Sequence, residues 1–362
     1  NCRRNHTKVR LTNEINNLKC ADIACGSGAF LLELYQLLYD SLVDYYFEND
    51  RSKLVQTSID TYKLPYEMKR NLLVNCIYGV DKDFNAVEAC KFGLLLKLLE
   101  DEDVNSLSSF HPILPDLSNN IFYGNSLLST ADVPADDAFE INPFDFGDRT
   151  FDLIVGNPPY MKTEDIKAFT PKEKSLYEKG NRYTSAYKQY DKYFLFIERA
   201  LNLLKPDGYL GYVVPNKFMK VGAAKELRNF IANNAYLKTM ISFGAHQVFA
   251  DKSTYTCIIV LEKNKHENFK YSEVSDFIGW RVRNVNAYKF CDRPSVTINA
   301  DTWILCTDEH LPLLNAVTAH TKPLGDIVGD DYIFNGIQTS ANKIYVFVPI
   351  SETRTTYTFK DF

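Results

Sequence analysis

Polar and apolar positions follow two different periods along the chain up to about residue 263. Short apolar runs of strand length alternate with stretches in which apolar residues recur at helical spacing. This alternation predicts a mostly parallel sheet with helices on both faces. The seven predicted strands are 20–25, 76–81, 120–124, 151–156, 209–214, 237–243 and 256–261, the last two forming a hairpin-like pair, and the predicted helices are 29–46, 86–99, 187–204 and 223–233.

The pattern changes after about residue 264 to short mixed runs separated by polar turns, as in 280–283. Residues 101–150 also contain a polar, acidic stretch at 131–137 that is typical of a surface loop. We therefore expect one α/β domain followed by the start of a smaller, β-rich unit that the chain does not complete.

Composition favours a folded protein of a reducing compartment. The 362 residues are 45% hydrophobic and 14% aromatic, enough for one large domain or two ordinary ones. None of the eight cysteines forms a Cys-x2-Cys pair, so we expect no metal site. Without a long apolar run or a signal peptide, we expect a cytoplasmic protein with no membrane contact, and the missing initiator Met indicates a partial chain.

Net charge alone argues mildly against a nucleic-acid partner, because the chain carries -5 overall. The distribution differs, since residues 162–192 hold eight basic and five acidic side chains together with four tyrosines. Basic residues interleaved with aromatic ones are typical of a phosphate-contacting loop. An ordinary solvated, partly helical face explains the same composition, and the sequence leaves both interpretations open.

The most informative segment is Asn157-Pro158-Pro159-Tyr160, which directly follows the apolar run 151–156. Consecutive prolines restrict the backbone, so Asn157 and Tyr160 are held at the carboxyl end of a strand, where open α/β sheets bind ligands. Asn157 offers an amide oxygen, Pro158 a carbonyl and Tyr160 a flat ring. These groups suit a planar base with an exocyclic amino group, whereas a lone Asn-Pro would fit a plain turn.

A Gly-rich turn follows the first predicted strand, in Ala21-Asp-Ile-Ala-Cys-Gly-Ser-Gly-Ala-Phe30. Gly26 and Gly28 let the backbone approach a ligand, and the following helix N-terminus adds positive potential. The turn lacks the third glycine of the dinucleotide fingerprint and the Gly-Lys-Ser/Thr of a P-loop. A Gly-x-Gly alone says little, but one after a strand that carries Asp22 indicates a small-molecule site.

Polar side chains also close the second and third predicted strands. A carboxylate at Asp81 suits a ribose diol, because it accepts from both hydroxyls. A helix N-cap is the alternative for Asp81 or Asp83, and for Asp83 we prefer it. Asn125 either hydrogen-bonds an adenine amino edge or caps a turn.

In order and spacing, these motifs resemble the gamma-class N6-adenine DNA methyltransferases of type II restriction–modification enzymes. The resemblance covers about residues 18–263 and, more loosely, 323–347. It implies a Rossmann-like, S-adenosylmethionine-dependent methyltransferase fold with a mostly parallel seven-stranded sheet and the start of a small β-rich domain. Residues 1–265 would then form the catalytic domain, and 266–362 a connector and the start of a target-recognition domain.

The resemblance also implies roles for single residues. Asn157 and Pro158 match the groups that accept hydrogen bonds from the target N6 amine, and Tyr160 matches the ring that stacks on the flipped base. Phe249 matches the aromatic residue on the other face, and Pro159 lies beside the substrate. The residues expected to bind S-adenosylmethionine are Asp22, Ala24, Gly26, Gly28, Asp81, Lys82 and Asn125.

The implied partners are double-stranded DNA and a restriction endonuclease, either fused or separate. Because the N6 atom cannot be reached inside a duplex, the base must be flipped into the site. Two departures from the family stand out: residues 1–19 lack its upstream Thr-Pro segment, and Asn125 stands where an acid is usual.

Two other functions remain open from the sequence. Glutamine N5 methylation and RNA guanine N2 methylation use the same tetrapeptide, although such enzymes usually end soon after the sheet. A non-catalytic, DNA-binding modification subunit is the third interpretation.

Overall fold

The computed structural model describes residues 15–249, 254–284, 286–322, 324–329, 351–352 and 357–358. The region of the missing Thr-Pro segment and most of 323–347 therefore lie outside the described residues. The chain divides into two compact units, Asn1–Thr307 and Asp308–Phe362. The second unit contains helices α12 (Leu311–His320) and α13 (Leu324–Val328) and the strand pair β12 (Ser351–Glu352) and β13 (Tyr357–Thr358). Within the described ranges, no helix combines the length and apolar character needed to span a bilayer.

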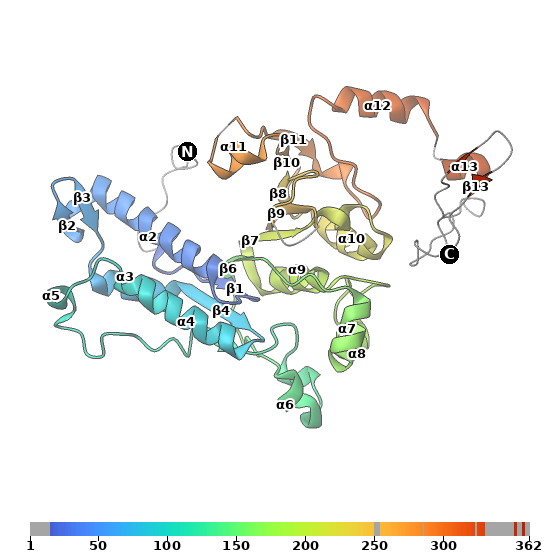
Figure 1. The fold of residues 1–362 in the computed structure, drawn as a ribbon. Helices are drawn as coiled ribbons and strands as arrows, with labels where there is room; N and C mark the ends of the chain where they lie inside the picture. Colours follow the sequence, from blue (N-terminus) through green and yellow to red (C-terminus); the bar gives the residue numbers. More distant parts are fainter. Residues whose placement is uncertain are drawn as a thin grey trace. The chain divides into compact units, whose positions relative to one another are not determined.

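A nine-stranded sheet organises the first unit, in the order β11-β10-β8-β9-β7-β6-β1-β4-β5 (Figure 1). All seven predicted strands belong to it, and β5-β4-β1-β6-β7 pair in parallel in the strand order of a Rossmann-like sheet. Strand β9 runs antiparallel to both β7 and β8, which confirms the predicted late pair. The seven strands are β1 (Cys20–Asp22), β4 (Ile77–Asp81), β5 (Ile121–Tyr123), β6 (Phe151–Gly156), β7 (Leu204–Pro215), β8 (Leu237–Ser242) and β9 (Thr256–Glu262).

Two strands extend this sheet beyond the predicted seven. Strand β10 (Asn268–Glu273) pairs in parallel with β8, and β11 (Cys291–Pro294) pairs antiparallel with β10. Phe269 and Tyr271 of β10 are buried, while Lys270 between them and Asn268 and Glu273 at the two ends of the strand are polar and exposed. Alternating apolar and polar residues predict a strand, but the polar residues of this segment made it resemble a connector in the sequence.

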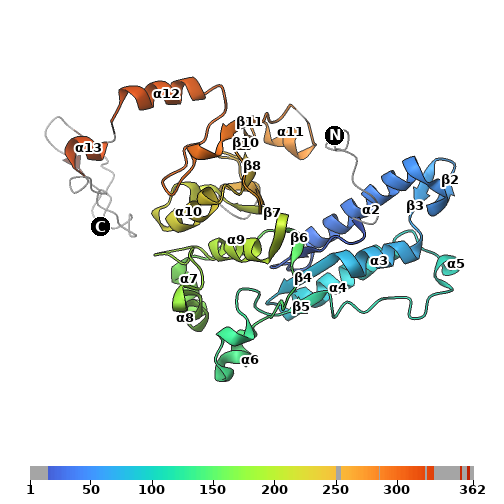
Figure 2. The same ribbon diagram turned by 180° about the vertical axis from the view of Figure 1, so that it is seen from behind.

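Helices on the two faces of the sheet bury separate cores, because neighbouring strand residues point to opposite sides. Cys20 of β1 enters one core and Ala21 the other. Helices α2 (Ala29–Asn49), α3 (Tyr66–Cys76) and α4 (Phe84–Leu99) pack together on the Cys20 side (Figures 1 and 2). Helices α9 (Lys192–Leu203) and α10 (Lys225–Asn233) supply the other core.

The local pattern did not predict every helix. Helix α3 and the hairpin β2 (Val55–Ser58) and β3 (Thr61–Lys63) were not expected. Helix α9 begins at Lys192 instead of residue 187, and it ends before the proline turn because β7 already begins at Leu204. The remaining helices are α5 (Val104–Leu107), α6 (Ala138–Ile141), α7 (Thr163–Phe169), α8 (Pro171–Glu178) and α11 (Phe277–Arg281).

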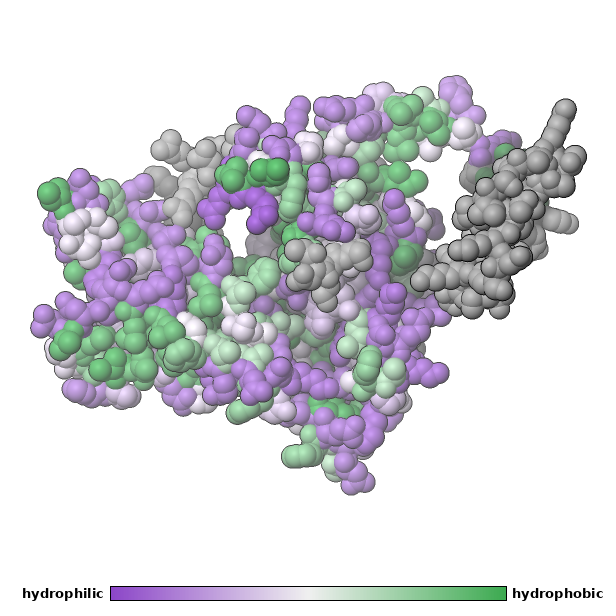
Figure 3. All heavy atoms as spheres, viewed as in Figure 1, coloured by the Kyte–Doolittle hydropathy of each residue, from purple (hydrophilic) through white to green (hydrophobic). Residues whose placement is uncertain are grey.

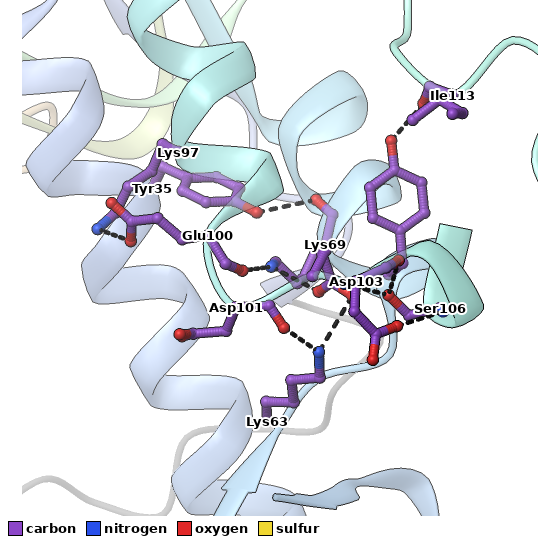
Figure 4. A network of polar contacts seen from close by, with 11 residues as sticks. Tyr35, Lys63, Lys69, Lys97, Glu100, Asp101, Asp103, Ser106 and Ile113 are labelled. Carbon is purple, nitrogen blue, oxygen red and sulfur yellow. Dashed lines mark hydrogen bonds and ion pairs between the residues drawn. The ribbon is translucent and has the colours of Figure 1, made fainter. Parts of the chain in front are cut away.

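A buried polar network closes the Cys20-side core near the end of α4. Glu102 lies 2.8 Å from the Lys69 Nζ and 3.1 Å from the Lys63 Nζ, and the Tyr35 hydroxyl donates to the Lys69 carbonyl. Figure 4 shows Lys63, Lys69 and Tyr35 converging there. Because α4 starts at the carboxyl edge of the sheet and runs back, this network lies at the opposite edge.

Apolar side chains remain on the solvent side of α4. Phe92 and Leu96, one helical turn apart, are both exposed, and Figure 3 shows apolar side chains gathering on this face. The carboxyl edge of the sheet, in contrast, carries charged and amide side chains, among them Asp81, Lys82, Asn125 and Asn157.

Candidate active site

The turns after β1, β4, β5 and β6 meet at the carboxyl edge of the sheet around one pocket of about 480 Å³. This volume is in the range of small-molecule sites. Six of the residues predicted from the sequence line the pocket, and Lys192 and Phe196 of α9 line it unexpectedly. The lining is Ile23, Ala24, Asp81, Lys82, Asp83, Gly124, Asn125, Ser126, Asn157, Pro159, Lys192 and Phe196.

The Gly-rich turn is fastened to the end of β4. Gly26 has φ +52° and donates its N–H to Asp81 Oδ2 at 2.7 Å, and a Cβ at Gly26 would meet only open space. Gly28 has φ +89°, and a Cβ there would lie 2.5 Å from the Cys90 Sγ of α4. Gly28 is therefore required for packing, whereas Gly26 leaves the turn open where a ligand can approach.

The Asp81 carboxylate keeps acceptor capacity. Its Oδ1 accepts the N–H of Asp83 at 2.9 Å, and its Oδ2 accepts that of Gly26. Each oxygen retains a further lone pair, so the group can also accept from a diol. Asp83 caps α4 by accepting from the N–H groups of Asn85 and Ala86, which confirms its expected N-cap role.

Asp22 ends β1, and its buried carboxyl group lies against Gly156 of β6. Its Oδ1 accepts the Ala24 N–H at 3.0 Å, and a Cβ at Gly156 would lie 2.6 Å from the same oxygen. Burial raises the pKa of Asp22 to about 7, against the lowering effect of the Ala24 hydrogen bond and with a smaller contribution from Asp81. The carboxyl group therefore changes charge near neutral pH beside the tetrapeptide.

Tyr160 folds back on Asn157. Its hydroxyl lies within hydrogen-bonding distance of Asn157 Oδ1 and also 3.1 Å from the Val213 carbonyl of β7. Its ring meets Tyr193 edge-on, with centroids 5.9 Å apart. Pro158 is buried and Pro159 is exposed at the pocket. The second lone pair and the amino group of the Asn157 amide are free to meet a planar base.

Phe249, the predicted second stacking residue, is half-buried in the loop between β8 and β9. Residues 250–253 of this loop lie outside the described parts. Its role on the base stays a prediction.

The basic segment 162–192 forms α7, α8 and a loop beside the tetrapeptide. Four of its eight basic residues pair with acids of the same unit: Lys172 with Asp137 and Glu140, Lys174 with Glu178, Arg182 with Asp132, and Lys192 with Glu173. Part of the positive charge is therefore neutralised internally.

A buried polar cluster that the sequence did not indicate connects this segment to the pocket. Glu173 of α8 is 3% exposed. Its Oε2 accepts a hydrogen bond from the Tyr177 hydroxyl at 2.7 Å and lies 3.3 Å from the Lys192 Nζ. Lys82, next to Asp81, pairs with its other oxygen, and the Asn125 amide contacts Tyr177. The only local signal is an acid and a tyrosine one helical turn apart, which is common on solvated helices.

Comparison with known proteins identifies related sequences. Residues 75–249 match the family of Eco57I restriction-modification methylases. The chain is 52% identical over 334 residues to the type II restriction enzyme and methyltransferase RM.Eco57I of Escherichia coli, covering 92% of this chain and 33% of RM.Eco57I. It is 26% identical over 357 residues to the type II methyltransferase M.BstVI of Geobacillus stearothermophilus, covering 92% of this chain and 56% of M.BstVI.

Among solved structures, a nuclease-deletion mutant of the Type ISP restriction-modification enzyme LlaGI, in complex with a DNA substrate mimic, aligns with a TM-score of 0.53. The alignment has 15% identity and covers 82% of this chain and 25% of that one. It supports the fold class, and the sequence matches confirm the resemblance to type II restriction–modification methyltransferases. The chain spans about a third of RM.Eco57I and about half of M.BstVI.

Proposed function

Because residues 75–249 match the family of Eco57I restriction-modification methylases, we propose that this chain methylates the N6 amine of an adenine flipped out of double-stranded DNA. The methyl donor would be S-adenosylmethionine, which supplies an electrophilic methyl group on a sulfonium. The observation that carries the proposal is the convergence of Asn157, Asp81 and Asn125 on one pocket. The coarser assignment, a methyltransferase of a restriction–modification system, rests on the sequence matches.

The pocket fits the cofactor on two observations. The position of a Gly26 Cβ is open space, so the turn admits a ligand close to its backbone. The Asp81 carboxylate retains lone pairs for a ribose diol after holding that turn. Asp22, Ala24 and Gly28 would shape the methionine side, while Lys82 and Asn125 would flank the adenosine.

The target amine needs orientation, because its lone pair is delocalised into the adenine ring. Asn157 Oδ1 and the Pro158 carbonyl would accept its two hydrogens and favour a pyramidal nitrogen. Asn cannot act as a base at neutral pH, so orientation and electrostatics would carry the catalysis. Tyr160, tied to Asn157 through its hydroxyl, would stack on one face of the base, with Phe249 on the other and Pro159 at the rim.

Methyl transfer to unmethylated genomic DNA tests the proposal, with N6-methyladenine detected by mass after digestion to nucleosides. Asn157→Ala should abolish the product and leave binding of S-adenosylhomocysteine nearly unchanged, because the partner of Asn157 is the substrate amine. Asn202→Ala, an exposed position on α9, is the matched control and should retain activity.

Equal loss of transfer and of cofactor binding in Asn157→Ala would contradict its assignment. Release factor protein and RNA run in parallel as substrates. Methyl transfer to glutamine or guanine would show that release factor or RNA, and not DNA, is the substrate. DNA binding without any binding of S-adenosylhomocysteine would favour a non-catalytic modification subunit.

The biological setting belongs to the same proposal. RM.Eco57I is named as both restriction enzyme and methyltransferase, and this chain spans 33% of it. We place the chain with an endonuclease, fused or separate, in the cytoplasm where it meets DNA. The sequence predicts residues 1–265 as the catalytic domain and 266–362 as the connector and the start of target recognition. Because β10 and β11 continue the sheet and the first compact unit ends at Thr307, we propose that the catalytic domain extends to about residue 307.

A further inference from the structure

The Asn125 amide is the first member of a buried hydrogen-bond chain. Its Oδ1 accepts the Leu127 N–H at 3.1 Å, and its Nδ2 lies 3.5 Å from the Tyr177 hydroxyl. That hydroxyl donates to Glu173 Oε2 at 2.7 Å. Asn125, Tyr177 and Glu173 are 4%, 0% and 3% exposed, so water does not substitute for these bonds.

The ionised Glu173 carboxylate gives the chain its direction. Burial alone would raise the pKa of Glu173, but Lys192 and Lys82 outweigh burial and lower it. An ionised carboxylate only accepts hydrogen bonds, so the Tyr177 proton must point at Glu173. Burial raises the pKa of Tyr177 well above its usual value, so the hydroxyl keeps that proton.

The direction of the Tyr177 hydroxyl determines which way the amide of Asn125 faces. With its proton directed at Glu173, the hydroxyl presents only lone pairs to Asn125, so the amide must turn its NH2 group toward Tyr177. The Leu127 N–H requires the opposite end to be oxygen. Both neighbours therefore specify the same orientation of an otherwise ambiguous side chain.

Resting on the function proposed above, we propose that Tyr177 and Glu173 are positioning residues that fix the Asn125 amide to read the adenine of the cofactor. One lone pair of Oδ1 and one Nδ2 hydrogen remain after the bonds already described. In a fixed order, this acceptor and donor match the amino group and a ring nitrogen of adenine. Hypoxanthine presents the reverse order at its O6 and N1–H, so an amide that cannot turn rejects it.

The replacement of the usual acid by Asn125 explains why such a chain is useful. A carboxylate has two equivalent oxygens and needs no orientation. An amide is asymmetric, and a turn by 180° exchanges its donor and acceptor. Tyr177 and Glu173, together with the Leu127 N–H, therefore supply the specificity that the side chain alone does not have.

The test compares dissociation constants of S-adenosylhomocysteine and S-inosylhomocysteine for the full chain by calorimetry. Tyr177→Phe keeps the ring and removes the hydroxyl, and we expect it to lower the preference for adenine about tenfold. Glu173→Gln should act in the same direction, because the amide of Gln can donate to Tyr177 and release its proton toward Asn125. The matched control is Tyr183→Phe. The Tyr183 hydroxyl donates to the Leu127 carbonyl at 2.6 Å and not to Asn125, so its removal should leave the ratio of the two dissociation constants unchanged.

A purely structural effect would weaken the binding of both ligands equally and keep the ratio of their dissociation constants. That result in both Tyr177→Phe and Glu173→Gln would overturn this inference and leave the proposed function standing. Failure of the unaltered chain to bind either ligand would overturn the proposed cofactor and, with it, this inference.

Discussion

Among single residues, Asp22 couples the stability of the fold to pH beside the predicted catalytic tetrapeptide. Its pKa of about 7 in the folded chain exceeds the value of about 3.9 for an unstructured chain. The native state therefore holds a proton that the unfolded state has lost between these two values. Its contribution to stability is complete below about pH 4 and is lost as the pH rises to 7.

Asp22→Asn should remove this dependence, because an amide does not titrate. The free energy of unfolding of the unaltered chain, relative to the variant, should fall between pH 4 and pH 7 by at most about 4 kcal/mol. Urea unfolding at pH values from 4.5 to 8 measures it. Asp83→Asn, at an exposed helix cap, is the control. Parallel pH profiles for Asp22→Asn and the unaltered chain would show that Asp22 is already ionised.

For single residues, the sequence predicts site positions that directly follow strands, but it does not predict side chains that pair across a long stretch of sequence. Asp81, Asn125 and Asn157 were expected to meet because each ends a parallel strand, and they line one pocket. Lys82 and Glu173 pair across 91 positions, and nothing local to either residue indicates the other. Glu173 therefore looked like one more charge of a solvated segment.

Among the elements, α7 and α8 follow the tetrapeptide and separate two kinds of lysine. Lys167 of α7 is exposed and makes no ion pair within the described ranges. Lys172 of α8 pairs with Asp137 at 2.6 Å and Glu140 at 2.8 Å, so its charge is already neutralised. Since α7 starts shortly after Tyr160, Lys167 is the better placed of the two to meet a phosphate near the flipped nucleotide.

Lys167→Ala should weaken DNA binding and reduce the slope of log K against log salt by about 1, the value for one phosphate contact. Lys172→Ala should change the slope little. Fluorescence anisotropy of a labelled duplex over a series of KCl concentrations measures both. An unchanged slope in both variants would favour the interpretation of this segment as an ordinary solvated face.

Elements with continuous apolar runs were predictable, and those with polar faces were not. The buried strands β1, β4, β6 and β7 read as apolar runs because helices cover both faces of the sheet. Strand β10 alternates polar and apolar residues near one edge, and it is recognised as a strand only once β8 is beside it.

For the whole molecule, the position of the domain boundary determines which truncated chains can fold. The sequence pattern changes near residue 265, but β10 and β11 continue the central sheet and the first compact unit ends at Thr307. Trp303, 2% exposed, packs edge-on against Phe218 with centroids 5.6 Å apart, and its backbone N–H donates to the Met219 carbonyl. The segment up to residue 307 therefore belongs to the same core as the strands of the site.

A chain of residues 1–307 should remain soluble and bind S-adenosylhomocysteine with the affinity of the full chain. A chain of residues 1–265 should aggregate, because it exposes the edge of β8 and uncovers Phe218, which is fully buried. Size-exclusion chromatography and calorimetry compare the two. Equal solubility and affinity would mean that β10, β11 and Trp303 are dispensable additions, and the boundary predicted at residue 265 would then mark the catalytic domain. The expected difference would assign the sheet extension to the catalytic domain and leave only residues beyond 307 for target recognition.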